Sequence, residues 1–321
     1  MKIAFKNVDK LSTQFVNSIP MHGDCINNTD LSQITSDYMG VDNPTMLSHL
    51  NLRLKAGVAL DGIGDNLTKI TMSGDHWRKK YDDGKWVIAD IMQESQVIHS
   101  CEVFGLFAGS CRQNSGIEEE SKRTLQGMVP DYSVKLDPQH SPILGEYKCI
   151  NTCASYHNSS TLKKRCGGVE KRASMINGEY IRKAKAADKK YNRFDNRNGA
   201  KGPMELRLQE LGFVWGIISG PRGEVSKDLH KLVETLAKLA GERRWRELGA
   251  RGVQDAQGHY SLYFRRTLGI TLVRAQATLK RERLGLVLGG WNEASERRRQ
   301  SEANYHSMRE EYQARSRRGM Q

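Results

Sequence analysis

Two short segments decide the fold: Val129-Pro130-Asp131-Tyr132-Ser133-Val134-Lys135-Leu136 and Ile143-Leu144-Gly145-Glu146-Tyr147-Lys148-Cys149-Ile150. Both have strand character, and the first largely alternates apolar and polar residues, which is typical of a β-strand with one buried face. Asp137-Pro138 closes the first segment with a turn signal, and a gap of six residues separates the two segments. The pattern therefore predicts a β-hairpin.

Three polar side chains stand out on this hairpin. Glu146 and Lys148 lie on the same face of their strand, because side chains alternate with period two. Asp131 heads the neighbouring strand and can lie beside them. Two carboxylates are hard oxygen ligands for Mg²⁺, and a lysine can orient or help deprotonate an attacking water. The alternative is an exposed hairpin in which Glu146 and Lys148 form a simple ion pair.

The pair Pro130-Asp131 followed by Glu146-x-Lys148 resembles the motif of the PD-(D/E)xK nuclease superfamily, which has the restriction-endonuclease-like fold. The resemblance covers about residues 95–220. It implies an α/β fold with a small mixed sheet flanked by helices, and Mg²⁺- or Mn²⁺-dependent hydrolysis of phosphodiester bonds. Asp131 and Glu146 would then be metal ligands and Lys148 the group that positions water. Since some members have lost catalysis, a non-catalytic nucleic-acid-binding protein with a decayed site is the alternative.

Two further features fit the same resemblance. Many members carry an acidic residue on the helix before the first motif strand, and Glu102 falls in a segment that we expect to be such a helix, over residues 91–107. Glu102 would be an auxiliary metal ligand through water. Many members also have a basic helix that faces the DNA backbone, and residues 169–191 match it with Lys183, Lys185, Lys189 and Lys190. The order of these motifs also looks like the nuclease-like tail of certain eukaryotic retroelement-derived proteins.

We expect the whole chain to divide into three parts: a poorly defined region over 1–90, an α/β domain with C-terminal helices over 91–290, and a charged tail over 291–321. The expected elements outside the hairpin are a helix over 44–59, a strand or helix start at 85–89, a polar segment over 112–124, a buried strand over 211–220, a helix over 225–239 that stops at Gly241, and a helix over 259–287.

Charge points to a polyanionic partner. The chain of 321 residues has a formal net charge of +13, and residues 162–321 hold 35 Lys and Arg against 18 Asp and Glu. Basic charge gathered in one half of a chain is typical of nucleic-acid binding. We expect DNA as the partner, with RNA left open. A second phosphate-contact surface on the C-terminal helices is as consistent with the sequence as a solvated face there: Arg243, Arg244, Arg246, Arg265, Arg266 and Arg274.

The sequence argues against several other classes of protein. No apolar run approaches the roughly 18–20 residues of a membrane-spanning helix, and the first residues lack a signal-peptide core. Six cysteines are too sparse for a disulfide framework, so we expect an intracellular protein, nuclear if eukaryotic and otherwise cytoplasmic. The spacing of Cys149, Cys153, His157 and Cys166 favours buried free thiols over zinc. The sequence leaves the oligomeric state open.

Overall fold

The computed structural model describes residues 26–54, 57–70, 76–107, 128–137, 139–153, 155–194 and 199–289, together with Asp9, Leu11, Thr13 and Ser110. Four strands form one mixed sheet in the order β1-β2-β3-β4. The strands are β1 (Ile98–Cys101), β2 (Tyr132–Lys135), β3 (Ile143–Cys149) and β4 (Val214–Ser219). The first three run antiparallel to one another, and β4 is parallel to β3. The chain is thus an α/β protein with a small mixed sheet.

The predicted hairpin is confirmed. β2 and β3 pair antiparallel with Tyr132 opposite Gly145, inside the segments that the alternation singled out. The buried strand expected over 211–220 is also confirmed as β4, which pairs with β3 so that Leu144 lies opposite Val214. Alternation along β3 places Tyr147 in one apolar cluster and Leu144 in another. The two faces of the sheet therefore bury two separate cores.

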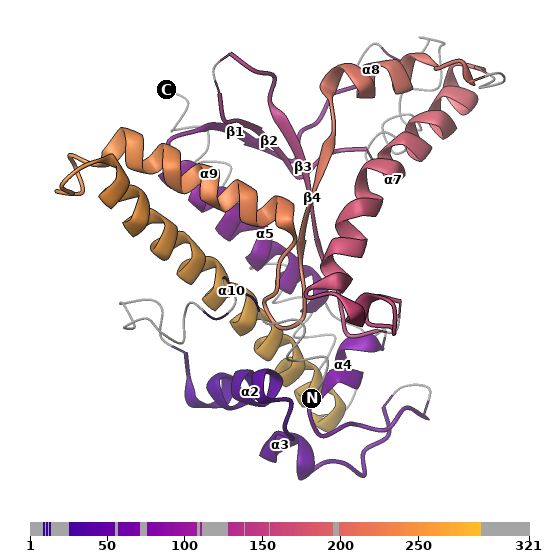
Figure 1. Cartoon of the computed structure of the whole chain (residues 1–321). Helices are drawn as coiled ribbons and strands as arrows, with labels where there is room; N and C mark the ends of the chain where they lie inside the picture. Colours follow the sequence, from indigo (N-terminus) through magenta and orange to yellow (C-terminus); the bar gives the residue numbers. More distant parts are fainter. Residues whose placement is uncertain are drawn as a thin grey trace.

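Helices cover both faces of the sheet (Figure 1). On one face lie α5 (His76–Glu94), α9 (Lys227–Arg244) and α10 (Val253–Gly289), and their apolar side chains pack around Tyr147. On the other face lie α7 (Gly167–Tyr191) and α8 (Pro203–Leu211), which pack around Leu144. The basic helix predicted over 169–191 is confirmed as α7. A single turn of 3-10 helix, η3 (Thr161–Lys163), precedes it.

The prediction of a helix over 91–107 is wrong, and Glu102 therefore does not lie on a helix. α5 ends at Glu94, and Ile98–Cys101 form the edge strand β1. Glu102 directly follows this strand and has a positive φ of 52°. The apolar residues of the segment come in short clusters that fit a helix face only loosely. Pairing with β2 along the sheet edge, which no local pattern reveals, decides the structure there.

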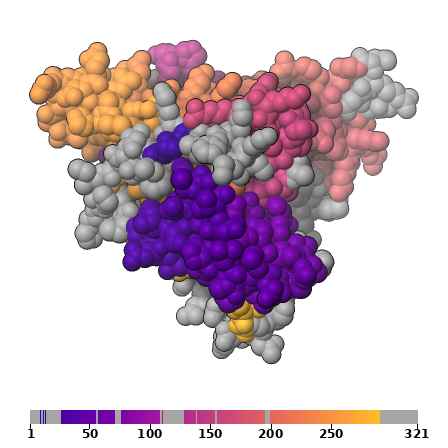
Figure 2. Space-filling model, turned by 60° about the horizontal axis from the view of Figure 1, so that its bottom comes forward, coloured from indigo at the N-terminus to yellow at the C-terminus, as the bar shows by residue number. Residues whose placement is uncertain are grey.

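An N-terminal group of helices packs against α10: α2 (Asn28–Met39), α3 (Pro44–Leu47) and α4 (Asp65–Lys69). These residues appear in indigo and violet in Figures 1 and 2, gathered on one side of the molecule. The helix expected over 44–59 is wrong beyond Leu47. Gly57 has a left-handed φ of 72°, and the chain turns back so that Arg53 bridges Ala59. The expected boundary between residues 90 and 91 falls inside α5.

Several helix limits also differ from expectation. Residues 85–89 lie in the middle of α5, and α8 was not expected. α9 continues past Gly241, whose missing side chain lets the backbone of Gln257 in α10 approach: a Cβ there would lie 2.8 Å from the Gln257 nitrogen.

None of the described helices is long and apolar enough to cross a membrane. The polar segment expected over 112–124 and the charged tail expected over 291–321 lie outside the described residues.

Candidate active site

Asp131 stands at the centre of the candidate site, immediately before β2 and only 7% exposed. Its Oδ2 accepts a hydrogen bond of 2.8 Å from the backbone nitrogen of Tyr147 in β3. Its Oδ1 accepts a hydrogen bond of 2.5 Å from the Tyr81 hydroxyl, on α5. These bonds fix the carboxylate against the strand that carries the other two motif residues.

Glu146 and Lys148 face the α7 side of β3. The Lys148 Nζ lies 2.5 Å from Glu146 Oε1, and Oε2 accepts a hydrogen bond of 2.7 Å from the Tyr180 hydroxyl on α7. Lys148 also lies over the Tyr81 ring, 5.4 Å from its centroid. Tyr81 thus contacts Asp131 through its hydroxyl and Lys148 through its ring. The three motif residues are therefore brought together by the sheet register and by two tyrosines that sequence reasoning missed.

A buried lysine completes the group. The Lys85 Nζ, on α5, lies 3.0 Å from Glu102 Oε1 and 3.2 Å from Asp131 Oδ1, with 3% of the side chain exposed. Glu102 reaches it from the end of β1, where its backbone nitrogen donates to the carbonyl of Asp131. Glu102 is therefore close to Asp131, as expected, although from a strand end instead of a helix.

Electrostatics fix the protonation states of Lys85, Tyr81 and Tyr180 in this group. Burial by itself would lower the pKa of Lys85, but the carboxylates of Asp131 and Glu102 outweigh burial and hold this pKa above its usual value. Burial, reinforced by the adjacent carboxylates, raises the pKa of Tyr81 and of Tyr180 well above the usual range. At neutral pH the lysine is charged and both tyrosines remain hydrogen-bond donors.

The donor set suits a hard cation. Asp131 and Glu146 offer carboxylate oxygens, and Mg²⁺ is commonly held by one or two carboxylates while it keeps several waters. All three carboxylates of the group also have an ammonium beside them: Lys85 contacts Glu102 and Asp131, and Lys148 contacts Glu146. Across the described residues, no three His, Cys, Asp or Glu side chains are grouped closely enough to hold a metal ion. Asp131 and Glu146 remain the two carboxylates that the sequence motif predicts as ligands for Mg²⁺ or Mn²⁺.

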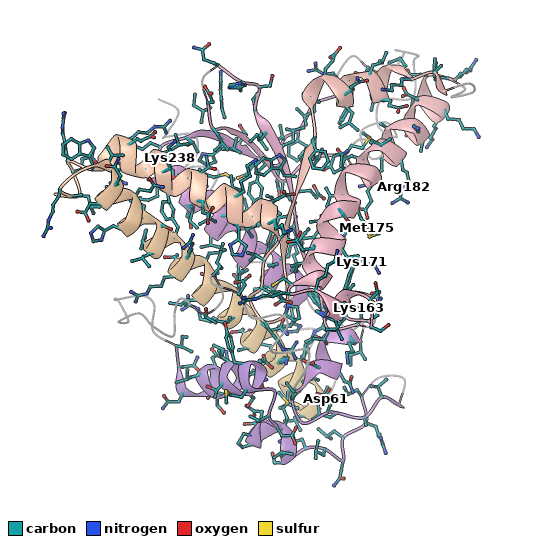
Figure 3. All side chains as sticks on the ribbon, viewed as in Figure 1. Asp61, Lys163, Lys171, Met175, Arg182 and Lys238 are labelled. Carbon is teal, nitrogen blue, oxygen red and sulfur yellow. The ribbon has the colours of Figure 1, made fainter. Side chains whose placement is uncertain are left out.

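The lysines predicted to contact nucleic acid are exposed along α7: Lys183, Lys185, Lys189 and Lys190. Lys183 lies over the Tyr180 ring, 5.5 Å from its centroid, and is thereby linked to Glu146. Lys185 lies 3.7 Å from Glu205. Figure 3 shows Lys171 and Arg182 projecting from the outer side of the same helix. The basic side of α7 therefore begins beside the candidate site.

The arginines of the C-terminal helices contact the protein itself. Arg243 donates to the carbonyls of Ser95 and Gln96, and Arg265 pairs with Glu234. Arg244 contacts Glu94 and Glu247, and Arg266 is 9% exposed. These contacts join α9 to the end of α5, and α10 to α9. They favour an internal role for Arg243, Arg244 and Arg265 over a second phosphate surface.

The three cysteines and the histidine whose spacing raised the question of zinc lie in surroundings that do not favour zinc binding. Burial raises the pKa of the Cys166 thiol to about 12 and also raises that of Cys149. The Cys153 thiol lies 2.7 Å from the Ser155 hydroxyl. Burial lowers the pKa of His157 to about 4. Burial therefore favours the protonated form of Cys149 and Cys166, whereas zinc binds thiolates.

Comparisons with known proteins place the chain in no family. The chain matches no protein-family model, no curated protein and no solved structure. The site is therefore interpreted from its own chemistry.

Proposed function

We propose that this chain is a divalent-metal-dependent nuclease that hydrolyses phosphodiester bonds in DNA. The observation that carries the proposal is the meeting of Asp131, Glu146 and Lys148 across two paired strands, with Tyr81 in contact with both Asp131 and Lys148. A small mixed sheet with helices on both faces agrees with the architecture that the PD-(D/E)xK resemblance implies. The excess of positive charge after residue 161 suits a polyanionic substrate.

Each residue then has a distinct task. Asp131 and Glu146 would hold the ion, which supplies a Lewis acid for the phosphate and lowers the pKa of bound water. Lys148, with 36% of its side chain exposed, is placed to orient the attacking water and to offset charge on the phosphate oxygens. Hydrolysis consumes one water, whose hydroxyl goes to phosphorus and whose proton goes to the departing sugar oxygen. Tyr81 and Tyr180 keep the two carboxylates oriented.

One observation favours a second candidate function, that of a non-catalytic nucleic-acid-binding protein. The ammonium of Lys85 already offsets the charge of Asp131 and Glu102. A site that carries its own fixed cation keeps its geometry without a metal ion. In this case the fold would present α7 to nucleic acid while the motif residues serve stability alone.

The decisive experiment measures cleavage of single- and double-stranded DNA with Mg²⁺ or Mn²⁺. We expect cleavage by the wild type and its loss in Asp131→Asn, Glu146→Gln and Lys148→Met, each with DNA binding retained. Asp137→Asn is the matched control, because this carboxylate lies on an exposed turn and has half of its side chain accessible. It should cut like the wild type. A wild type that binds DNA but cuts neither substrate with either ion would support the non-catalytic alternative.

A further inference from the structure

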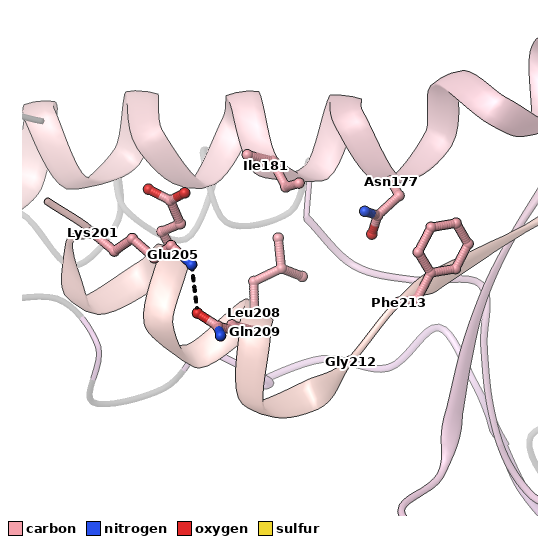
Figure 4. A pocket seen from close by; sticks show the side chains of 8 residues that line it. All are labelled: Asn177, Ile181, Lys201, Glu205, Leu208, Gln209, Gly212 and Phe213. Carbon is pink, nitrogen blue, oxygen red and sulfur yellow. Dashed lines mark hydrogen bonds between the residues drawn. The ribbon is translucent and has the colours of Figure 1, made fainter. Parts of the chain in front are cut away.

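A cavity of about 290 Å³ lies between α7, α8 and the turn that leads into β4 (Figure 4). Ile181 and Leu208 form its apolar walls, and polar side chains from both helices stand around it. Its volume is at the lower end of the range for small-ligand sites, roughly 300–1,000 Å³. Such a space suits a single flat ring system better than an extended cofactor.

The local sequence places an aromatic ring at this cavity. Gly212 ends α8 with a φ of 89°, a value that glycine adopts without strain and other residues rarely adopt. The chain then enters β4 at Val214, which is fully buried, while Phe213 just before it is 56% exposed. Exposed phenylalanine is costly in water, and here its ring lines the cavity together with Asn177. The ring is thus available for stacking.

Two carboxamides at the cavity are oriented by bonds to the protein. Asn177 Oδ1 accepts a hydrogen bond of 3.2 Å from the backbone nitrogen of Val214. Gln209 Oε1 accepts one of 2.8 Å from Lys201 Nζ, as Figure 4 shows. With both oxygens engaged, the amino groups are the sides that can donate to a ligand. The carboxylate of Glu205, whose Oε1 lies 3.7 Å from Lys185 Nζ, also lines the cavity.

We propose that this cavity binds one unpaired nucleobase of the nucleic-acid strand, stacked against Phe213. A base is flat, stacks on aromatic rings and carries hydrogen-bond acceptors and donors on its edge. A purely apolar partner side chain would leave the two amino groups without acceptors. Exposed Arg182 and Lys183 follow the cavity residue Ile181 on α7 and suit the phosphates of the same strand.

The helix α7 contributes side chains to both the cavity and the candidate active site. Ile181 lines the cavity, while its neighbour Tyr180 donates a hydrogen bond to Glu146. A strand that follows α7 can therefore present a base to the cavity and a phosphate to Glu146 and Lys148. The inference rests on the proposed function only in taking nucleic acid as the ligand. It makes single-stranded or locally unpaired nucleic acid the preferred substrate class.

The test measures binding without cleavage, using Asp131→Asn protein in chelator. The probe is a single-stranded DNA oligonucleotide with fluorescent 2-aminopurine bases, compared with its fully paired duplex and with an oligonucleotide of the same length made of abasic sites. We expect tighter binding to the single strand than to either comparison, with a change of fluorescence. Adding Phe213→Ala should weaken single-strand binding about tenfold, since base stacking on an aromatic ring is worth about that much.

Phe213→Trp should restore binding, because the larger ring also stacks. The matched control is Leu262→Ala on α10, an apolar residue that is 53% exposed and remote from the cavity. It should leave the dissociation constant unchanged. The inference would be overturned if the protein with Phe213→Ala bound the single strand as tightly as the protein that keeps Phe213. It would also be overturned if the abasic and the base-containing strands bound with equal affinity. A failed nuclease assay leaves these readouts intact, so the two proposals fail separately.

Discussion

The ammonium of Lys85 lies 3.2 Å from Oδ1 of Asp131, and both side chains are almost completely buried. The same ammonium lies 3.0 Å from Glu102. Three elements, α5, β1 and β2, are thus joined at the candidate site by one charged group. Loss of one member of a buried ion pair leaves the other charge uncompensated, which is far more costly than loss of a surface pair.

Replacing Lys85 with Met should therefore lower the free energy of unfolding by about 3 kcal/mol, because Asp131 remains buried, and Glu102 partly buried, without their cation. Urea denaturation followed by circular dichroism measures the change. Lys79→Met is the matched control on the same helix, since Lys79 is half exposed and pairs with Glu282. It should cost less than about 1 kcal/mol. Equal stability of the two variants would show that Lys85 does not hold the site together.

The basic side of α7 should determine how DNA binding responds to salt. Reversing Lys183, Lys185 and Lys189 to Glu should weaken binding to all sequences alike. It should also reduce the slope of log K against log salt by about two to three units, since each phosphate contact contributes about 0.9. Reversing Lys227, Lys231 and Lys238 on α9 changes the net charge equally on the opposite side of the sheet. If both triple variants give the same slope, α7 is not the binding surface.

Glu224 should give the fold a pH dependence. Burial raises the pKa of Glu224 to about 7, from an ordinary value of 4.5. The folded state thus keeps a proton that the unfolded chain releases. The free energy of unfolding should fall as pH rises from about 4.5 to about 7, by at most about 3 kcal/mol, and then level off.

Glu224→Gln stays neutral and should lose less stability over this interval than the wild type. Urea denaturation at pH 4.5 and 7.5 compares the two proteins. Glu234→Gln, an exposed residue that is 61% accessible, should keep the wild-type dependence. An unchanged pH dependence in Glu224→Gln would contradict the assignment of the proton to this carboxyl group.

Replacing two glycines at or near α7 with alanine should change the stability of the protein in opposite directions. A Cβ at Gly216, in β4, would lie 2.5 Å from the Cα of Ala173, so α7 would have to move away from the sheet. Gly216→Ala should therefore destabilise the protein by about 1–3 kcal/mol. A Cβ at Gly178, on the exposed side of α7, meets nothing within 4 Å. Gly178→Ala should stabilise the helix by about 0.5–1 kcal/mol. Melting temperatures that shift in the same direction would contradict this packing.

The parts of the fold that were predictable from sequence are those governed by local periodicity. Alternation identified β2 and β3, and helical spacing together with basic charge identified α7. Strand β1 was missed because its four residues are held by pairing with β2 rather than by a pattern of their own. The long apolar cluster near residue 47 suggested a helix, yet a turn at Gly57 reverses the chain there.

The candidate site was predictable to a similar extent. Asp131, Glu146 and Lys148 were found because strand spacing fixes which side chains share a face. Tyr81 and Lys85 are four residues apart on α5, and both contact Asp131. Nothing in the sequence links them to a strand that begins about fifty residues later. A buried lysine looks like any exposed lysine until its partners are known.

The ion pairs of Lys280 have a consequence for the order in which the chain folds during synthesis. Lys280, in α10, lies 2.8 Å from Asp65 in α4 and 2.6 Å from Asp37 in α2, and it is 1% exposed. More than two hundred residues separate the lysine from either partner. A ribosome that has made α2 and α4 must therefore translate most of the described chain before these two carboxylates meet Lys280. Until then these helices have contacts such as those of Arg222 with Asp37 and Asp65 but lack their packing against α10, so a nascent chain stalled before residue 253 should leave this region more open to protease.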